Sequence, residues 1–389
     1  MAGMRVPFGP QHPVLKEPLN FQFEIEGEVV VSVKPRIGYA HRGIEKLAET
    51  KTFVQNIYLM ERICGICSLQ HAMCYAQAVE KIIPLSVPRR ALYIRLILHE
   101  LERIHSHFLW LGLTAYAMGF ESLFMYALRD REEVMKVLEE ISGHRVNYGM
   151  IILGGVQRDL DSSKVDRIRR VMGFFEERTR YYKSICAKDP LMQKRSQGIA
   201  ILSPKDAKAL CAVGPILRAS GIRRDIRSDD RYGAYDEVPF EPVVYDGCDL
   251  ESRILLRCDE VLESVEVVKY TLDHLPGGDI RVKAPARVPA GEGWSRVEAP
   301  RGENFHYVLS SGGATPSRLK VRTPTVANLL ALCKMMEGIH IADIPVVITG
   351  IDPCIGCADR MAFVDVDKGK SWVWDEEYLR RYGVKWYSG

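Results

Sequence analysis

The first apolar pattern in the chain has a period of two. Between residues 20 and 34 every second side chain is apolar on either side of Gly27: Phe21, Phe23, Ile25, Val29, Val31 and Val33. This alternation is typical of half-buried strands, and the glycine marks a turn or bulge between them. We therefore expect a small β element within residues 1–40.

Further along, the apolar period changes to that of a helix. A long helix is predicted from Ser86, a candidate N-cap with Pro88 just inside it, and its buried face carries Ile94, Ile97, Leu98, Leu101, Ile104, Phe108 and Leu111. The same spacing returns at 130–142, 164–184 and 249–275, where Pro276-Gly277-Gly278 ends the pattern. Residues 54–275 are predicted to form a mainly helical bundle.

A second β region is expected within residues 279–322. Its hairpin runs through Phe305, Tyr307 and Leu309, turns at SSGGATPS, and returns through Leu319 and Val321. A helix from Thr323-Pro324 to about Glu337 follows, so residues 323–360 hold a helix and the last cysteine pair. Without repeats or a linker, residues 1–389 are predicted to be a single α+β domain, with a helical core and small peripheral antiparallel β elements.

Composition narrows the class of protein. Of the 389 residues, 47% are apolar and 26% charged, which is ordinary for a globular chain. The 53 basic and 50 acidic residues leave no basic footprint, so nucleic acid is not an expected partner. Residues 104–120, the most apolar stretch, are too interrupted by polar residues to span a bilayer. The ten dispersed cysteines and a start unlike a signal peptide favour the reducing cytoplasm.

Four cysteines form two Cys-x-x-Cys pairs near opposite ends of the chain. The first pair is Cys64 and Cys67, and the second is Cys354 and Cys357. Thiolates are soft ligands that suit zinc, iron-sulfur clusters, copper(I) or nickel. The spacing within each pair favours structural zinc. The long separation between the two pairs argues against it, because the cysteine pairs of zinc sites usually lie within a few tens of residues of each other.

A helical pattern continues directly from the first pair. It places Cys67 and His71 at i and i+4 on one face, where His71 would hydrogen-bond the Cys67 sulfur. The alternative for His71 is a satisfied core histidine. The remaining cysteines are interpreted as small buried apolar residues: Cys74, Cys186, Cys211, Cys248, Cys258 and Cys333.

Two sets of motifs carry a family resemblance over residues 8 to 360. RICGICSLQH and DPCIGCADR resemble the two metal-binding motifs of nickel-iron hydrogenase large subunits. GPQHP, GYAHRGIEKLAETKTF, SGIRRDIR and YDEVPFEPVVYDGCDLESR resemble the quinone-site subunit of respiratory complex I. A chain with both sets is similar to the catalytic large subunit of energy-converting, membrane-bound nickel-iron hydrogenases.

The resemblance implies a ligand set. Cys64 and Cys354 would bind nickel terminally, while Cys67 and Cys357 would bridge nickel to an iron that carries carbonyl and cyanide ligands. The two ends of the chain would then meet at the metals. Arg301, in EAPRGE, would hold its guanidinium over the open face between them, and its alternative is a solvent-exposed hairpin edge.

The resemblance also implies outer residues. Pro300 and Asp352 match positions around the metals, and Glu45, in HRGIEK, would bind magnesium unless it is a surface residue. Glu26, in EIEGE, would relay protons with Cys357, although the strand pattern alone puts it on one solvated face with two other glutamates. A proton relay requires a carboxylate near the thiolates, with its pKa moved toward neutrality by burial.

Three features depart from soluble hydrogenases or extend the resemblance. Arg103 and Ile104 replace an Asp-His pair, and Arg360 replaces the histidine that ends the second motif, which fits the membrane-bound branch. Residues 361–389 resemble an extension that a maturation protease removes after Arg360, once nickel is loaded.

The function implied is reversible reduction of protons to H2. Electrons would come from iron-sulfur clusters of a small partner subunit, with ferredoxin as the indirect donor, and antiporter-like integral membrane subunits would couple the reaction to ion translocation. A maturation protease and nickel chaperones are further implied partners, and the location would be peripheral, on the cytoplasmic side of the cell membrane. The alternatives are a complex I-type quinone or coupling subunit without hydrogen chemistry, and a structural zinc scaffold.

Overall fold

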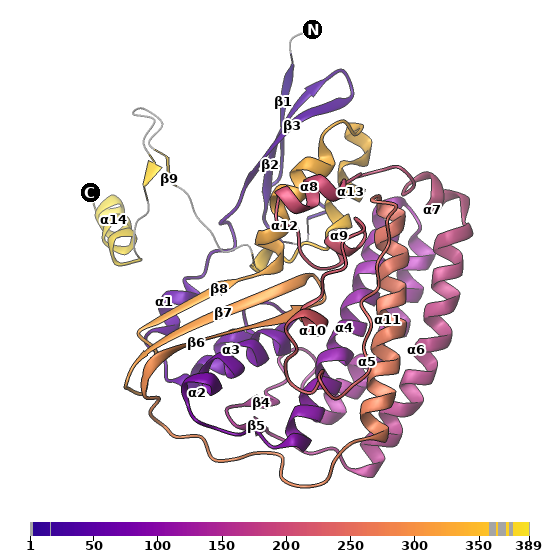
Figure 1. The fold of residues 1–389 in the computed structure, drawn as a ribbon. Coiled ribbons are helices and arrows are strands. Elements are labelled where there is room, and N and C mark those ends of the chain that lie inside the picture. Colours follow the sequence, from indigo (N-terminus) through magenta and orange to yellow (C-terminus); the bar gives the residue numbers. More distant parts are fainter. Residues whose placement is uncertain (1–2, 16, 358–362, 365–370, 373–375, 389) are drawn as a thin grey trace.

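The computed structural model describes residues 3–15, 17–357, 363–364, 371–372 and 376–388. Long helices stand side by side, one three-stranded sheet projects at the amino-terminal end, and a second three-stranded sheet crosses the body beside the helices (Figure 1). The predicted α+β class with a mainly helical core is therefore confirmed.

Four long helices form the bundle: α4 (Arg89–Met118), α5 (Glu121–Ser142), α6 (Ser162–Lys188) and α11 (Leu250–Asp273). α4 packs against both α5 and α11 and is buried along most of its length. Gly119 and Gly143 end α4 and α5 with positive φ angles of 90° and 84°, which glycine adopts without strain. The predicted N-cap at Ser86 is wrong: α4 begins after Pro88, whose extended backbone occupies the N-cap position.

Three shorter helices precede the bundle: α1 (Ile44–Ala48), α2 (Phe53–Glu61) and α3 (Ser68–Ile82). Thr52 and Gln55 form a reciprocal capping box that fixes the start of α2. α3 is buried on nearly every side, because it packs against α2, α4 and the second three-stranded sheet. These helices carry the first cysteine pair into the interior.

The amino-terminal sheet has the order β1 (Met4–Phe8), β2 (Asn20–Glu26) and β3 (Val29–Arg36), all antiparallel. The second sheet consists of β6 (Ala290–Ala299), β7 (Gly302–Ser311) and β8 (Arg318–Arg322). Sequence analysis missed β6, which lies in a segment rich in Pro, Gly and Val. Gly293 lets β6 approach α3 closely, since an added Cβ would lie 2.1 Å from the Ala78 carbonyl oxygen.

Four short helices lie between α6 and α11: α7 (Pro190–Lys194), α8 (Pro204–Ala209), α9 (Pro215–Arg218) and α10 (Ile226–Asp229). Sequence analysis assigned this segment to the helical core without predicting these helices individually. The small hairpin β4 (Ile151–Ile152) and β5 (Gly155–Val156) precedes α6. Beyond the second sheet lie α12 (Pro324–Met336), a 3-10 turn (Ile341–Asp343), α13 (Ile344–Gly350) and a second 3-10 turn (Ile355–Cys357). Further on, β9 (Phe363–Val364) pairs with β10 (Ser371–Trp372), and α14 (Glu376–Ser388) follows. Among the described residues, we find no helix long and apolar enough to cross a membrane.

Candidate metal centre

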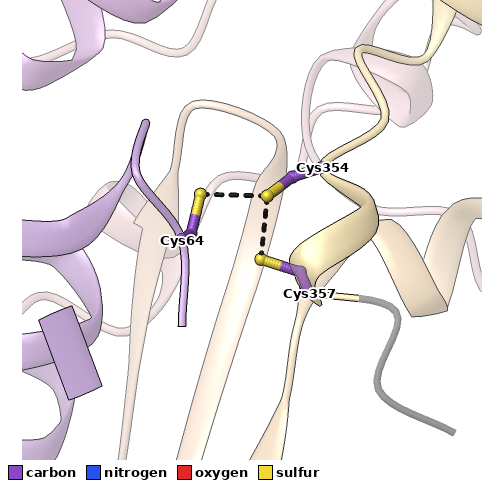
Figure 2. Close-up of side chains that lie close together, drawn as sticks. All are labelled: Cys64, Cys354 and Cys357. Carbon is purple, nitrogen blue, oxygen red and sulfur yellow. Dashed lines mark hydrogen bonds between the residues drawn. The ribbon is translucent and has the colours of Figure 1, made fainter. Parts of the chain in front are cut away.

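The two cysteine pairs meet in the interior. Cys64 lies in the turn between α2 and α3, Cys67 caps α3, and Cys354 and Cys357 follow α13. The Cys64 and Cys354 sulfurs are 3.0 Å apart, and those of Cys354 and Cys357 are 3.2 Å apart (Figure 2). All four side chains are buried. Residues from opposite ends of the chain therefore form one thiol cluster.

These sulfurs are close enough to share ions. Because a zinc–sulfur bond is about 2.3 Å long, two sulfurs on such an ion are at most about 4.6 Å apart. The ligand atoms of Cys64, Cys354 and Cys357 lie within 4.8 Å of one another, and so do those of Cys67, His71 and Cys357. Cys357 belongs to both sets, which fits a thiolate that bridges two ions. The four buried sulfurs suit nickel, iron or zinc.

The polypeptide itself joins the two cysteine turns. Arg42 donates to the carbonyl oxygens of Arg62 (2.6 Å) and Ile63 (2.8 Å) beside the first pair, and to that of Gly356 (3.1 Å) in the second. Thr323 donates to the Cys357 carbonyl oxygen at 2.8 Å. Arg42 therefore positions both pairs, a role that sequence analysis did not assign, although the residue lies in the HRG segment quoted there.

The cluster holds one negative charge readily. Hydrogen bonds from the thiols of Cys354, Cys357 and Cys67 keep the pKa of Cys64 well below its usual range, and the positive charge of Arg301 adds to this. The pKa of Cys357 lies well above its usual range, chiefly through its hydrogen bond with Cys354. A bound cation would supply the charge needed to ionise the remaining thiols.

Arg301 lies beside the cluster, in the turn between β6 and β7. Its Nε donates to the Asp352 carbonyl oxygen and its Nη2 to Asp352 Oδ1, both at 2.7 Å, and its Nη1 is 3.3 Å from Ser106 Oγ. With 1% exposure, it is not on a solvent-exposed edge. Burial opposes its charge, but Asp352 and then the sulfurs of Cys354 and Cys64 raise its pKa above the usual value. Arg301 is a fixed buried cation that interacts electrostatically with the sulfurs.

Two outer residues lie close to Arg301. Pro300 is buried in the same turn. Asp352 is also buried, with a positive φ of 58°, and its Oδ2 has no hydrogen-bond partner among the described residues. Burial raises the pKa of Asp352, and the charge of Arg301 opposes that shift.

His71 contacts a different sulfur from the one expected. Its Nε2 is 3.7 Å from Cys357 Sγ, so the hydrogen bond predicted to Cys67 is replaced by one to the opposite pair. The reason is local, because Cys67 caps α3 with φ −129° and lies outside the helical geometry that the i, i+4 argument assumed. Burial lowers the pKa of His71 to about 4, so its ring is neutral at physiological pH.

Glu26 lacks the burial that was expected of a proton relay, and its role in proton transfer stays a prediction. Glu26 is exposed at the end of β2, beside the turn at Gly27, whereas a proton relay needs a buried carboxylate near the thiolates. A different carboxylate reaches the second cysteine pair. Glu17 is also exposed, but its Oε2 accepts the Gly356 backbone N–H at 2.6 Å. Glu17 follows the GPQHP segment, whose irregular backbone carries no periodic signal that could have singled it out.

Glu45 is partly buried beneath the second sheet. It accepts hydrogen bonds from Lys320 Nζ (2.8 Å) and the Val321 backbone N–H (2.9 Å), and it lines a small cavity together with Cys357. In the described part of the chain, the groups that could hold a metal ion do not include Glu45. Its role in magnesium binding stays a prediction, and Arg360, the predicted processing site, lies outside the described residues.

Sequence analysis also missed a network of charges in the interior of the protein. Arg218 donates to Glu260 (2.6 Å) and Glu298 (2.7 Å). Arg103, at one of the departing positions, donates to Glu100 at 3.0 Å. All of these side chains are almost completely buried. Charged residues at helical spacing suggest a solvated face, so periodicity alone could not indicate that they pair with one another inside the bundle.

Comparison with known proteins supports these observations. A family model described as "Respiratory-chain NADH dehydrogenase, 49 Kd subunit" matches residues 117–287 and 281–360, and one described as "Nickel-dependent hydrogenase" matches residues 42–117. The chain is 37% identical to the membrane-bound hydrogenase subunit alpha of Pyrococcus furiosus, with 98% of this chain and 93% of that one covered. It is 38% identical to formate hydrogenlyase subunit 5 of Escherichia coli, with 98% of this chain and 67% of that one covered.

Other relatives carry different activities in their names. One subunit of the F(420)H(2) dehydrogenase of Methanosarcina mazei is 35% identical, over 92% of this chain and 98% of that one. The fold also matches a chain in the structure of the membrane-bound sulfane sulfur reductase, an archaeal respiratory membrane complex, with a TM-score of 0.88 and 30% identity over 92% of this chain and 99% of that one. Similarity over nearly the whole chain thus extends to relatives with several redox activities.

Proposed function

The chain belongs to the family that unites the large subunits of nickel-dependent hydrogenases with the 49-kDa subunit of respiratory complex I, and from this membership we propose that it is the catalytic subunit of a nickel-iron hydrogenase. The observation that carries the proposal is the convergence of four buried cysteines on one site. Two cysteine pairs separated by almost the whole chain bring four thiols together in the interior, a donor set that suits soft metal ions.

The residues present fit a pair of metal ions. Cys64 and Cys354 would each bind nickel, and Cys67 and Cys357 would lie between nickel and an iron that carries carbonyl and cyanide. When bound, these metals supply a redox centre at which protons and electrons combine to H2. The protein excludes water from this centre, because all four sulfurs are buried.

Two side chains would assist the chemistry. Arg301 holds a fixed positive charge beside the sulfurs, where a water-excluded site makes it effective against developing negative charge. Glu17 is hydrogen-bonded to the backbone of Gly356, next to Cys357, and this contact supports a role in passing protons to or from the site. We assign Glu17 the role that sequence analysis gave to Glu26.

The partners follow from the same proposal. The described residues offer no second thiol cluster that could hold an iron-sulfur cluster. Electrons would therefore arrive from a small iron-sulfur subunit, with ferredoxin as the indirect donor. Relatives named as subunits of membrane-bound complexes support antiporter-like membrane partners, which would place this chain peripherally on the cytoplasmic side of the membrane.

The test compares two single cysteine variants of the assembled complex. Cys64→Ser should lose nickel, together with H2 evolution and the infrared bands of carbonyl and cyanide. Cys186→Ser, a change at a buried cysteine of α6, should keep all three. A wild-type complex that contains zinc, or no metal, in this site would refute the proposal. Zinc would then favour the structural zinc scaffold, and a site without metal would favour the complex I-type quinone or coupling role.

A further inference from the structure

His71 has a second set of contacts, on the side of its ring away from Cys357. Its Nδ1 lies 3.0 Å from His306 Nε2 and 3.2 Å from Asn304 Nδ2. All three side chains are completely buried. His306 and Asn304 are two positions apart on β7, so both face α3, while Tyr307 on the same strand points to the other face and is bonded to Glu292.

The positions of protons decide what this arrangement does. A neutral imidazole carries one ring proton, on either Nδ1 or Nε2, and the partner of one nitrogen determines the state of the other. A metal-bound thiolate has no proton and can only accept. For His71 to donate to Cys357, its proton must therefore be on Nε2, and its Nδ1 must accept a hydrogen bond.

β7 supplies the required donors. His306 can donate its Nε2–H to His71 Nδ1. The Asn304 side-chain amide has its nitrogen, and not its oxygen, toward His71, and this nitrogen donates to the same atom. The opposite tautomer of His71 would turn a lone pair toward the thiolate and would require His306 Nε2 to be bare. Two donors on one side and an acceptor sulfur on the other select a single tautomer.

We propose that His306, supported by Asn304, is a positioning residue that holds His71 as a hydrogen-bond donor to the Cys357 sulfur. The inference rests on the proposed function in one respect, because it requires a bound metal that keeps the Cys357 thiol ionised. Donation from His71 withdraws negative charge from the sulfur that would lie between the two metals, so β7 tunes the centre without touching it.

The experiment reads the tautomer directly, in the full-length chain labelled with ¹⁵N-histidine and loaded with zinc, whose closed electron shell broadens no signals. In the wild type, the ¹⁵N spectrum should show His71 protonated at Nε2 and bare at Nδ1. His306→Ala should lower the ratio of Nε2–H to Nδ1–H tautomer at least about fivefold, the change expected from one neutral hydrogen bond. His306→Gln, whose amide can still donate, should restore the ratio, and Tyr307→Phe should leave it unchanged.

Two results would overturn the inference. One is a wild-type His71 that carries its proton on Nδ1, a result that needs no variant to fold. The other is a folded His306→Ala chain, verified by its thermal melting, with the wild-type tautomer ratio. Neither result depends on hydrogen chemistry, because the measurement uses zinc. A chain without hydrogenase activity would still support this inference if its His71 tautomer is the expected one. A chain with hydrogenase activity but the opposite tautomer would overturn this inference alone.

Discussion

Replacing Arg301 with methionine tests whether the cation beside the thiol cluster is required by its buried partner. The variant would remove two hydrogen bonds of 2.7 Å to Asp352 and leave that carboxylate buried without its ion pair. Breaking a buried ion pair from one side costs about 3–5 kcal/mol. Arg301→Met should lower the free energy of unfolding of the metal-free chain by about that amount. Arg301→Met/Asp352→Asn, which leaves no unpaired charge, should recover at least about 1 kcal/mol of the loss.

The matched control is another buried arginine. Arg253 is as inaccessible to solvent as Arg301, but it makes one hydrogen bond, to the Cys248 carbonyl oxygen at 2.9 Å, and no ion pair with a carboxylate among the described residues. Arg253→Met should therefore be nearly neutral. Urea unfolding followed by circular dichroism measures all four chains. A loss below about 1 kcal/mol for Arg301→Met, or a double variant no more stable than the single one, would contradict the reasoning.

Three further predictions use the same structure. Glu17→Gln should slow H2 evolution by the assembled complex on the order of a hundredfold, whereas Glu26→Gln should leave the rate unchanged; equal effects would refute the reassignment. Burial depresses the pKa of His107 to about 4 and of His99 to about 3, so only the unfolded chain takes up these protons as the pH falls below 6.5. The free energy of unfolding should fall by roughly 3 kcal/mol per histidine between pH 6.5 and 4, and His107→Gln should flatten that slope in urea titrations. Gly302→Ala should lower the melting temperature, because Gly302 has φ 126° and an added Cβ would lie 2.8 Å from the Gly214 nitrogen; an unchanged melting temperature would contradict this.

Periodicity predicted the long elements because each carries one continuous apolar face. The apolar residues of α4 and the alternation in β2 and β3 carry that signal without reference to the rest of the chain. Elements shaped by partners were missed. β6 exposes Trp294 and buries small residues such as Gly293 and Ser295 against α3, so its side chains do not show the expected apolar alternation.

The same distinction explains the candidate site. The four cysteines could be found from sequence, because thiol pairs are rare and chemically distinctive. Arg42, Glu17 and His306 could not, since each acts through a contact between segments far apart in the chain. The Arg42 bond to Gly356 spans 314 positions, and the His306 contact with His71 spans 235. Burial, which separates Arg301 from ordinary surface charges, is likewise a property of the fold.

The contacts around the cysteines also change what the metals do for stability. The resemblance implied that the two ends of the chain meet at the metals, but Arg42 already connects the two cysteine turns through the polypeptide. Thr323 and Glu17 hold the second turn by further hydrogen bonds. If the folded chain forms the site without metal, bound metal stabilises the fold only because it binds the folded state. The added stability then depends on the ratio of the free metal concentration to the dissociation constant. Small metal-nucleated domains behave differently, because their apo forms unfold. We therefore expect a chelator to lower the melting temperature of the loaded chain while leaving its far-ultraviolet circular dichroism at room temperature unchanged. Loss of the helical spectrum at room temperature after metal removal would show that the metals, and not these hydrogen bonds, hold the two ends together.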